Sequence, residues 1–109
     1  MKNKIYYSPQ ASRDMDEIWD YIVLELQNPS AAENTVNRIL DAIDQLADFA
    51  EIGSPLSSVA EVESDYRVLV TGNYLTFYRT QGNEVYIDRI LYGRRDYLRI
   101  LFEGMTDDA

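Results

Sequence analysis

Apolar residues in the first half of the chain recur at steps of three and four, the spacing of amphipathic helices. The first apolar stripe comprises Ala11, Met15, Ile18, Trp19, Ile22, Val23 and Leu26, and the second comprises Val36, Ile39, Leu40, Ile43, Leu46 and Ala47. Ser8-Pro9 is a helix start, with serine as the cap and proline in the first turn. Asn28-Pro29-Ser30 ends this helix and begins the next, expected over about residues 30–49. The pattern predicts two antiparallel helices joined by a short turn, with Trp19 in the core.

From residue 66 the pattern changes to β-forming residues separated by tight turns. Strands are expected over residues 66–71 and 74–79, on either side of the hairpin signal Gly72-Asn73. Residues 81–83 form the next turn, and the strand after it alternates, with Arg89 on the same face as Val85, Ile87 and Leu91. If that face is buried, Arg89 needs an ion-pair partner, and a carboxylate of the first helix is the expected one.

Four further segments complete the predicted organisation. Ile5 and Tyr7 alternate with polar neighbours and predict a short first strand, while residues 54–65 are serine-rich and acidic and predict a loop. Residues 96–102 predict a terminal helix, and residues 103–109 a flexible tail. The expected fold is α+β, an antiparallel β-sheet with an N-terminal helical hairpin packed on one face, in the order β-α-α-β-β-β-α. A chain of 109 residues corresponds to a single domain, residues 1–109.

The composition narrows the chemistry that the chain can perform. It contains no cysteine and no histidine, which excludes disulfides, thiolate metal sites and the usual acid–base group near neutral pH. The carboxylates show no metal-binding spacing, so neither a metal nor another cofactor is expected. The chain has no apolar run of 18 residues, and its first residues are too polar for a signal peptide. The sequence therefore predicts a cytoplasmic protein without a membrane partner.

The charge is strongly acidic overall but unevenly distributed. The net charge is −9, yet residues 66–102 hold six of the ten basic residues and carry a net charge of +3. A body of this charge disfavours direct non-specific binding to DNA, which depends on lysine and arginine at phosphates, and it suits a basic protein partner. One arginine- and tyrosine-rich surface on an acidic body indicates a localised site.

Four segments of the chain resemble one known family. They are YSPQASRDMDEIWDYI at the start, the turn NPSAA, the meander YRVLVTGNYLTFYR and the ending ILYGRRDYLRILF. Together, in this order, they resemble the RelE/ParE superfamily, the toxins of type II toxin–antitoxin modules that stabilise plasmids. The resemblance covers residues 5–102, nearly the whole chain.

The resemblance implies a toxin that a cognate antitoxin neutralises. The antitoxin is expected to contact a groove between the helical hairpin and the sheet, or the exposed edge of the sheet. Two activities occur in the superfamily: RelE-like members cleave messenger RNA in the ribosome, and ParE-like members poison DNA gyrase and so inhibit growth. A module that binds the antitoxin without being toxic is a third reading. A second copy of the chain, giving a homodimer, is a further partner that the sequence leaves open.

The residues that stand at the positions of the RelE-like cleavage site distinguish between the two activities. That chemistry uses positive groups around the scissile phosphate, but residues 48–66 contain no lysine or arginine, and Tyr74 stands where the family has a central-strand arginine. Only Arg95 matches, with Tyr97 close to the position of a family tyrosine. The resemblance therefore favours the ParE-like branch and DNA gyrase, with the ribosome and messenger RNA as the alternative.

Two sets of candidate site residues follow from these readings. For cleavage the catalytic candidates are Arg67, Arg79, Arg95 and Tyr97, and for contact with a target or partner they are Tyr74, Tyr78, Arg94, Arg95 and Arg99. Each also has a structural reading. Arg67 and Arg79 can pair with the abundant carboxylates. The set of Tyr74, Tyr78, Tyr86 and Tyr92 can form an aromatic surface for a partner or for stacked bases, but tyrosine is also an ordinary half-buried strand residue.

Overall fold

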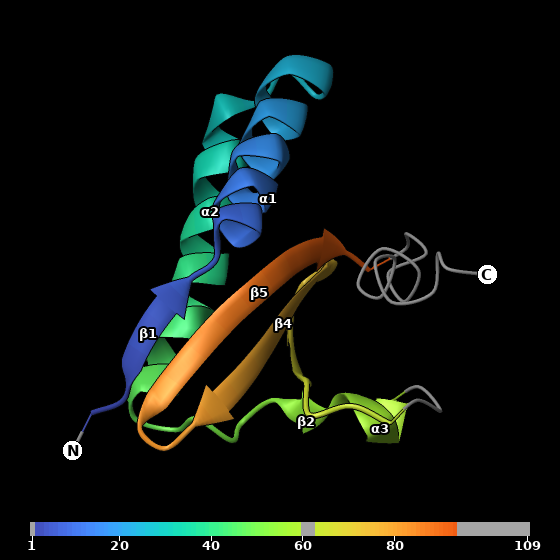
Figure 1. Ribbon diagram of the computed structural model, residues 1–109. Coiled ribbons are helices and arrows are strands. Elements are labelled where there is room, and N and C mark those ends of the chain that lie inside the picture. The colour runs from blue at the N-terminus through green and yellow to red at the C-terminus, as the bar shows by residue number, and fades with distance from the viewer. Residues whose placement is uncertain (1, 60–62, 94–109) are drawn as a thin grey trace.

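Two helices pack side by side against one face of a five-stranded sheet in the computed structural model, which describes residues 2–59 and 63–93 (Figure 1). The elements in chain order are β1 (Lys4–Tyr7), α1 (Pro9–Asp20), the π-helical turn η1 (Tyr21–Glu25), α2 (Pro29–Asp44), the 3-10 turn η2 (Gln45–Ala47), β2 (Ser54–Pro55), α3 (Leu56–Val59), β3 (Arg67–Thr71), β4 (Tyr74–Gln81) and β5 (Glu84–Tyr92). The predicted α+β class is confirmed. The short β2 and α3 occupy part of a segment predicted as a loop, and that prediction is wrong for residues 54–59. The predicted terminal helix and tail lie outside the described residues.

Both helices of the hairpin begin at the predicted caps. The Ser8 hydroxyl accepts a hydrogen bond from the Ala11 amide at 2.9 Å, and the Asn28 side chain accepts one from the Ala31 amide at 3.1 Å. Each cap is followed by a proline, whose missing N–H costs nothing in the first helical turn. Between the helices, Gln27 has a φ of 50°, a left-handed conformation that is uncommon for a residue other than glycine.

The strand order in the sheet is β1-β5-β4-β3-β2. β3, β4 and β5 form the predicted meander, and Gly72 and Gly82 each have a φ of 59° at the first position of a two-residue turn. β2 pairs with β3 in the antiparallel sense, but β1 pairs with β5 in parallel. The sheet is thus mostly antiparallel, and β1 departs from the expected arrangement because a helical crossover returns the chain to the opposite edge of the meander.

A β-bulge in β5 changes which residues face the helices. Tyr78 pairs with Ile87 and Phe77 pairs with Arg89, so Asp88 is an extra residue in β5. Val85 and Ile87 lie on the helix side before the bulge, and Ile90 lies there after it. The predicted uninterrupted alternation over residues 84–91 is therefore wrong beyond Ile87.

The main core lies between the hairpin and the sheet. It is built from Ala11, Ile18, Ile22, Ala32, Ile39, Ile43, Leu46, Tyr78, Val85, Ile87 and Ile90. Most residues of the two predicted stripes pack here or against it, but Trp19 does not belong to it. Its side chain is 40% exposed, because Ile18 and Ile22 point at the sheet and Trp19 lies about 100° further round the helix. The prediction of a core tryptophan is wrong.

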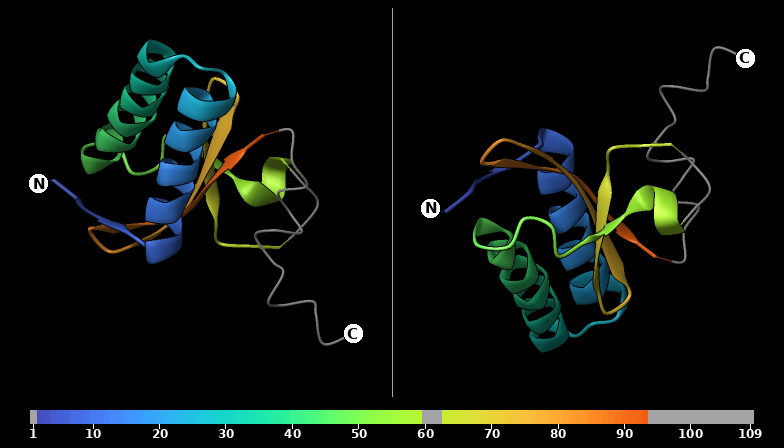
Figure 2. Two further views of the ribbon diagram at one scale, coloured as in Figure 1. Left: turned by 90° about the horizontal axis from the view of Figure 1, so that it is seen from above. Right: turned by 90° about the horizontal axis from the view of Figure 1, so that it is seen from below.

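The opposite face of the sheet is also covered. Val68, Phe77 and Leu91 point away from the hairpin and are buried. α3 lies on this side, and its first residue Leu56 is fully buried (Figure 2). None of the helices within residues 2–59 and 63–93 is long and apolar enough to cross a membrane.

Candidate functional site

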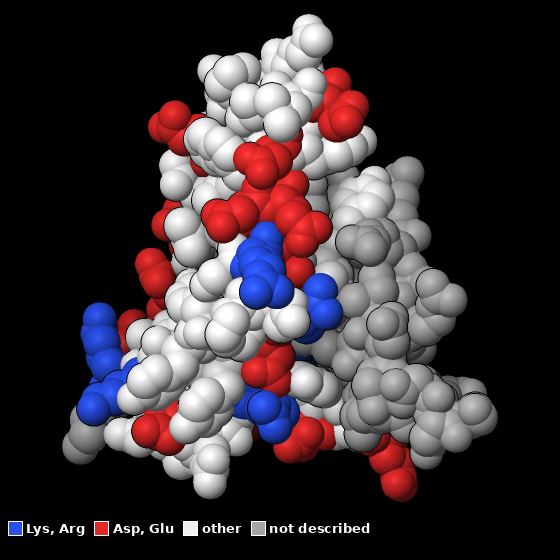
Figure 3. Space-filling model, turned by 45° about the horizontal axis from the view of Figure 1, so that its top comes forward, with Lys and Arg blue, Asp and Glu red and all other residues white. Residues whose placement is uncertain are grey.

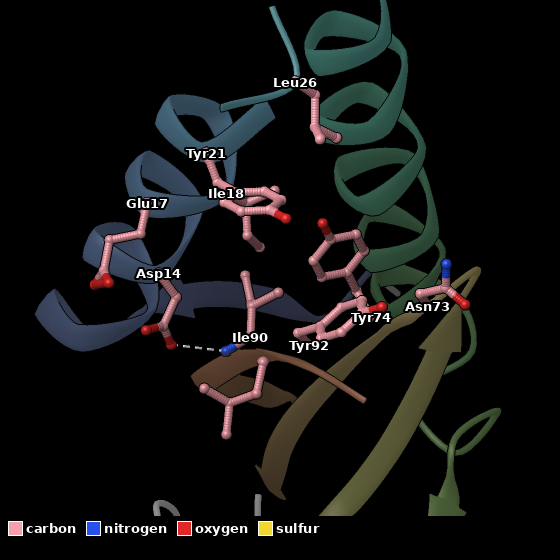
Figure 4. Close-up of a pocket in the computed structure, with 10 residues that line it drawn as sticks. Asp14, Glu17, Ile18, Tyr21, Leu26, Asn73, Tyr74, Ile90 and Tyr92 are labelled. Atoms are coloured by element: carbon pink, nitrogen blue, oxygen red, sulfur yellow. Dashed lines mark hydrogen bonds between the residues drawn. The ribbon is translucent and has the colours of Figure 1, made fainter. Parts of the chain in front are cut away.

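A groove of about 530 Å³ lies between the far end of α1 and the ends of β4 and β5 (Figure 4). We call it the tyrosine groove and define it by Asp14, Glu17, Ile18, Tyr21, Leu26, Tyr74, Ile90 and Tyr92. Ile18 and Ile90 form apolar parts of its wall, and Tyr21, Tyr74 and Tyr92 turn their rings into the space below Leu26. A groove is therefore present between the helical hairpin and the sheet, the location named from the sequence.

The tyrosines of the groove form a compact aromatic group. The ring centroids of Tyr74 and Tyr92 lie 5.6 Å apart at an interplanar angle of 60°, a tilted contact that aromatic quadrupoles favour. Burial raises the pKa of Tyr74, and the nearby Tyr92 and Tyr21 hydroxyls raise it further. Tyr21 itself is 55% exposed and Leu26 56% exposed, so the groove opens directly to solvent on the hairpin side.

Asp14 connects α1 to β5 at one wall of the groove, next to the point where β1 ends. Its carboxylate accepts hydrogen bonds from Arg89 Nε at 2.8 Å, from Arg89 Nη2 at 3.0 Å and from the Ile90 amide at 2.9 Å. β1 pairs with β5 only as far as Ile87. Beyond that point the Asp14 carboxylate, and not a strand carbonyl, accepts the hydrogen bond from the Ile90 amide at the edge of β5. The predicted pairing of Arg89 with a carboxylate of the first helix is confirmed.

Arg67 lies on the helix side of the sheet and is held by the chain before β2. Its Nη1 donates to the carbonyl oxygens of Gly53 at 2.6 Å and Glu51 at 3.3 Å, and its Nη2 lies 3.5 Å from the Glu51 carboxylate. It pairs with Tyr78 in the β3–β4 ladder, so the two side chains share a face. These contacts agree with the structural reading of this arginine.

Arg79 lies on the other face of the sheet. Its Nε donates to Asp88 Oδ2 at 2.9 Å, and its guanidinium carbon lies 5.5 Å from the centroid of the Tyr66 ring. Burial raises the pKa of Tyr66 to about 12, with further contributions from its hydrogen bond to Asp88 and from the charge of that carboxylate. Because neighbouring strand residues alternate in direction, the sheet separates Arg67 from Arg79 instead of bringing them together.

Tyr78 is not part of an aromatic surface. Its side chain is fully buried, its hydroxyl donates to the Ala50 carbonyl at 2.8 Å, and the same oxygen accepts from the Gly53 amide at 3.0 Å. It cannot contact a partner from this position, so its place among the partner-binding candidates is a wrong prediction. The cause is that its strand position faces the hairpin and its hydroxyl satisfies two backbone groups of the chain before β2.

Of the other candidates, some line the groove, one lies on the other face of the sheet, and the rest lie outside the described residues. Tyr74 and Tyr92 line the groove, whereas Tyr86 lies on the other face of the sheet, stacks on Tyr6 at 5.5 Å and donates its hydroxyl to Glu84. Arg94, Arg95, Tyr97 and Arg99 lie outside the described residues. Among residues 2–59 and 63–93, no group of three acidic residues is placed to hold a metal ion.

The sequence interpretation missed the hairpin side of the groove. Neither Glu17 nor Tyr21 is among the candidate residues that the sequence indicates. One signal was available, since the apolar stripe runs on to Leu26 immediately before the Asn28-Pro29 break. The last apolar residues of the first helix therefore had to lie next to the turn that joins the two helices.

Comparison with known proteins places the chain in a family. A family model described as the ParE toxin of the type II toxin–antitoxin system parDE matches residues 5–97. A chain of the chromosomal ParDE toxin–antitoxin system from P. aeruginosa superposes with a TM-score of 0.69 at 26% identity, covering 84% of this chain and 96% of that chain. No curated protein sequence matches.

A second solved structure is similar in fold alone. It belongs to the toxin–antitoxin complex RelBE2 from Mycobacterium tuberculosis, with a TM-score of 0.60 and 16% identity over 84% of this chain and 99% of that chain. The family model, by contrast, spans most of the sequence and includes the hairpin, the sheet and every residue of the tyrosine groove. The chain belongs to the ParE toxin family of type II toxin–antitoxin systems.

Proposed function

We propose that this toxin inhibits growth by poisoning DNA gyrase and that a cognate antitoxin neutralises it by occupying the tyrosine groove. Membership of the ParE family and the similarity to a chain of a ParDE system support the assignment of both partners. Such a pair encoded on a plasmid would stabilise that plasmid. Arg94, Arg95 and Arg99 are the proposed gyrase contacts, on the strength of their charge and their place directly after β5.

The single observation that carries the gyrase assignment is the separation of Arg67 from Arg79. Cleavage of RNA needs several cations converging on one phosphate. These two arginines lie on opposite faces of the sheet, and each is already engaged, one with Glu51 and the other with Asp88. A protein that acts by binding gyrase needs no such convergence, so this arrangement favours the ParE-like activity over ribosome-dependent cleavage.

The groove supports the antitoxin assignment. Stable protein contacts depend on a few buried anchors, frequently tyrosine, that fill a well-formed depression. Tyr74 and Tyr92 provide such a floor, while Tyr21 and Leu26 are exposed at its mouth. An extended or helical antitoxin segment laid along α1 would cover both.

Controlled expression in a bacterial host tests the proposal. Induction without the neighbouring gene should arrest growth with a DNA damage response and intact transcripts, and co-expression of that gene should restore growth. Purified protein should trap gyrase on cleaved DNA. Codon-phased transcript cuts without a DNA damage response would mean a ribosome-dependent nuclease, and growth without arrest would mean a non-toxic antitoxin-binding module.

A matched variant sharpens this choice. Arg79→Gln removes a cation that is 46% exposed, so folding should be retained. A gyrase poison with contacts after β5 should keep its toxicity in this variant, and a nuclease that uses Arg79 should lose it. Arg95→Ala serves as the counterpart and is expected to abolish gyrase trapping.

A further inference from the structure

The tyrosine groove combines two kinds of group that attract cations. Tyr21, Tyr74 and Tyr92 present aromatic rings to one space, and Asp14 and Glu17 line the other side of the groove, with Glu17 directed away from the rings (Figure 4). The negative face of an aromatic ring binds ammonium and guanidinium groups. The carboxylate of Asp14 is occupied by Arg89, whereas Glu17 is exposed and makes no close ion pair with any residue that the structure describes, although its charge helps to raise the pKa of Arg89. Glu17 is thus the carboxylate of the groove that a partner can reach.

The surface around the groove has the same sign. Along α1 and η1 a single arginine stands against five carboxylates, namely Asp14, Asp16, Glu17, Asp20 and Glu25. α2 adds one arginine and three carboxylates. Figure 3 shows acidic side chains spread over the helical part of this face, while most of its basic side chains lie lower down. A partner that approaches along the hairpin therefore meets a negative potential.

The same elements expose apolar side chains next to these charges. Leu24 is 70% exposed and Leu26 is 56% exposed, both next to the turn that joins the two helices. An apolar strip flanked by carboxylates is complementary to an amphipathic segment with lysine or arginine beside its apolar residues. Nucleic acid is a poor occupant, because its phosphates would be repelled by this surface.

We propose that the tyrosine groove selects a basic amphipathic protein segment, which packs apolar side chains against the tyrosine rings and places a lysine or arginine at Glu17 on the other side of the groove. The aliphatic stem of such a side chain packs against apolar surface while its charge reaches the carboxylate. The inference rests on the proposed function in one respect, since it identifies the partner with the antitoxin. It adds the chemistry of the contact: the groove-binding segment of that antitoxin is positively charged.

Two synthetic helical peptides test the charge preference directly. Both carry leucine along one face, and the other face carries lysine in one peptide and glutamate in the other. Calorimetric titration of the full chain should give a dissociation constant at least about tenfold lower for the lysine peptide. Amide NMR shifts on binding should map to α1, η1 and the ends of β4 and β5. Equal binding of the two peptides, or shifts centred elsewhere, would overturn the proposal.

Matched variants separate a specific site from general attraction to an acidic protein. Glu17→Gln and Asp41→Asn each remove one carboxylate, the first in the groove and the second on the exposed surface of α2. Glu17→Gln should weaken the lysine peptide about tenfold, and Asp41→Asn by less than about twofold. Similar effects of the two variants would show that the groove does not hold the cation.

The same titration with the product of the neighbouring gene distinguishes this inference from the proposed function. If that protein does not bind but the lysine peptide behaves as described, the antitoxin assignment fails and the groove chemistry stands. If that protein binds tightly and neither Glu17→Gln nor raised salt changes its affinity, the antitoxin assignment stands and the charge inference is wrong.

Discussion

Asp14 and Arg89 are 75 residues apart in sequence and form a two-pronged ion pair, with N–O distances of 2.8 and 3.0 Å. The pair ties α1 to the bulged part of β5, and the same carboxylate holds the Ile90 amide. The Asp14 side chain is only 6% exposed. This contact therefore links the two walls of the tyrosine groove, and it lies directly beside the bulge that brings Ile90 onto the helix side of the sheet.

Replacement of Asp14 by alanine should be strongly destabilising. The change leaves a largely buried guanidinium and a buried strand amide without their acceptor, so the free energy of unfolding should fall by about 3 kcal/mol. Asp14→Asn keeps one acceptor and should lose less. Urea denaturation followed by circular dichroism measures both. Asp16→Ala, on the exposed side of the same helix, is the control and should change stability by less than about 0.5 kcal/mol. Equal losses at the two positions would contradict the assigned role of Asp14.

Tyr66 should make the stability fall at high pH. Its pKa is raised to about 12, first by burial and then by Asp88, whereas an unfolded tyrosine titrates near about 10. Between these two values the folded state binds more protons than the unfolded state, so the contribution of Tyr66 to stability is fully present below about pH 10 and is lost as the pH rises toward 12.

The variant Tyr66→Phe removes this contribution. Its stability at pH 8 sets the baseline, and its decline between pH 10 and about 12 should be shallower than that of the wild type. Some decline remains, because Tyr7, Tyr74 and Tyr78 also have raised pKa values. Urea midpoints measured across this range give both curves, and parallel curves would show that Tyr66 is not the group responsible.

Tyr78 and Gly53 should show coupled effects on stability. Tyr78→Phe leaves the Ala50 carbonyl and Gly53 amide without their shared partner and should cost about 1–2 kcal/mol. In Gly53→Ala the new Cβ would lie 2.6 Å from the Tyr78 hydroxyl oxygen and 2.9 Å from the Val68 carbonyl oxygen, at an expected cost of about 2 kcal/mol or more. The double variant should lose less than the sum, since one of these clashes disappears with the hydroxyl. Strict additivity in a double-mutant cycle would contradict the direct contact.

Local features of the fold could be predicted because they depend on neighbouring residues. Ser8 and Asn28 precede prolines and cap helices, and glycine begins both hairpin turns. The type of residue that pairs with Arg89 could also be predicted. An arginine in a buried part of a strand requires a carboxylate, and the first helix is rich in carboxylates.

The remaining features depend on contacts between distant elements. The bulge at Asp88 lies within a strand whose alternation is regular in sequence, and only pairing with β4 reveals the extra residue. The parallel pairing of β1 is likewise a matter of topology. The exposure of Trp19 follows from which side of α1 faces the sheet, since Ile18 and Ile22 occupy that side. The location of the groove could be predicted but most of its lining residues could not, because they come from four separate elements.

Leu26 should contribute to antitoxin binding without contributing much to stability. It lies at the mouth of the tyrosine groove with 56% of its side chain exposed, so Leu26→Ser should leave the urea midpoint nearly unchanged. If the antitoxin covers the groove, loss of this apolar contact should raise the dissociation constant by about tenfold or more, measured by calorimetry with the product of the neighbouring gene. Phe49→Ser is the control, because Phe49 is 65% exposed but lies two residues after η2 and does not line the groove. An effect of Phe49→Ser as large as that of Leu26→Ser would place the antitoxin contact elsewhere on the hairpin.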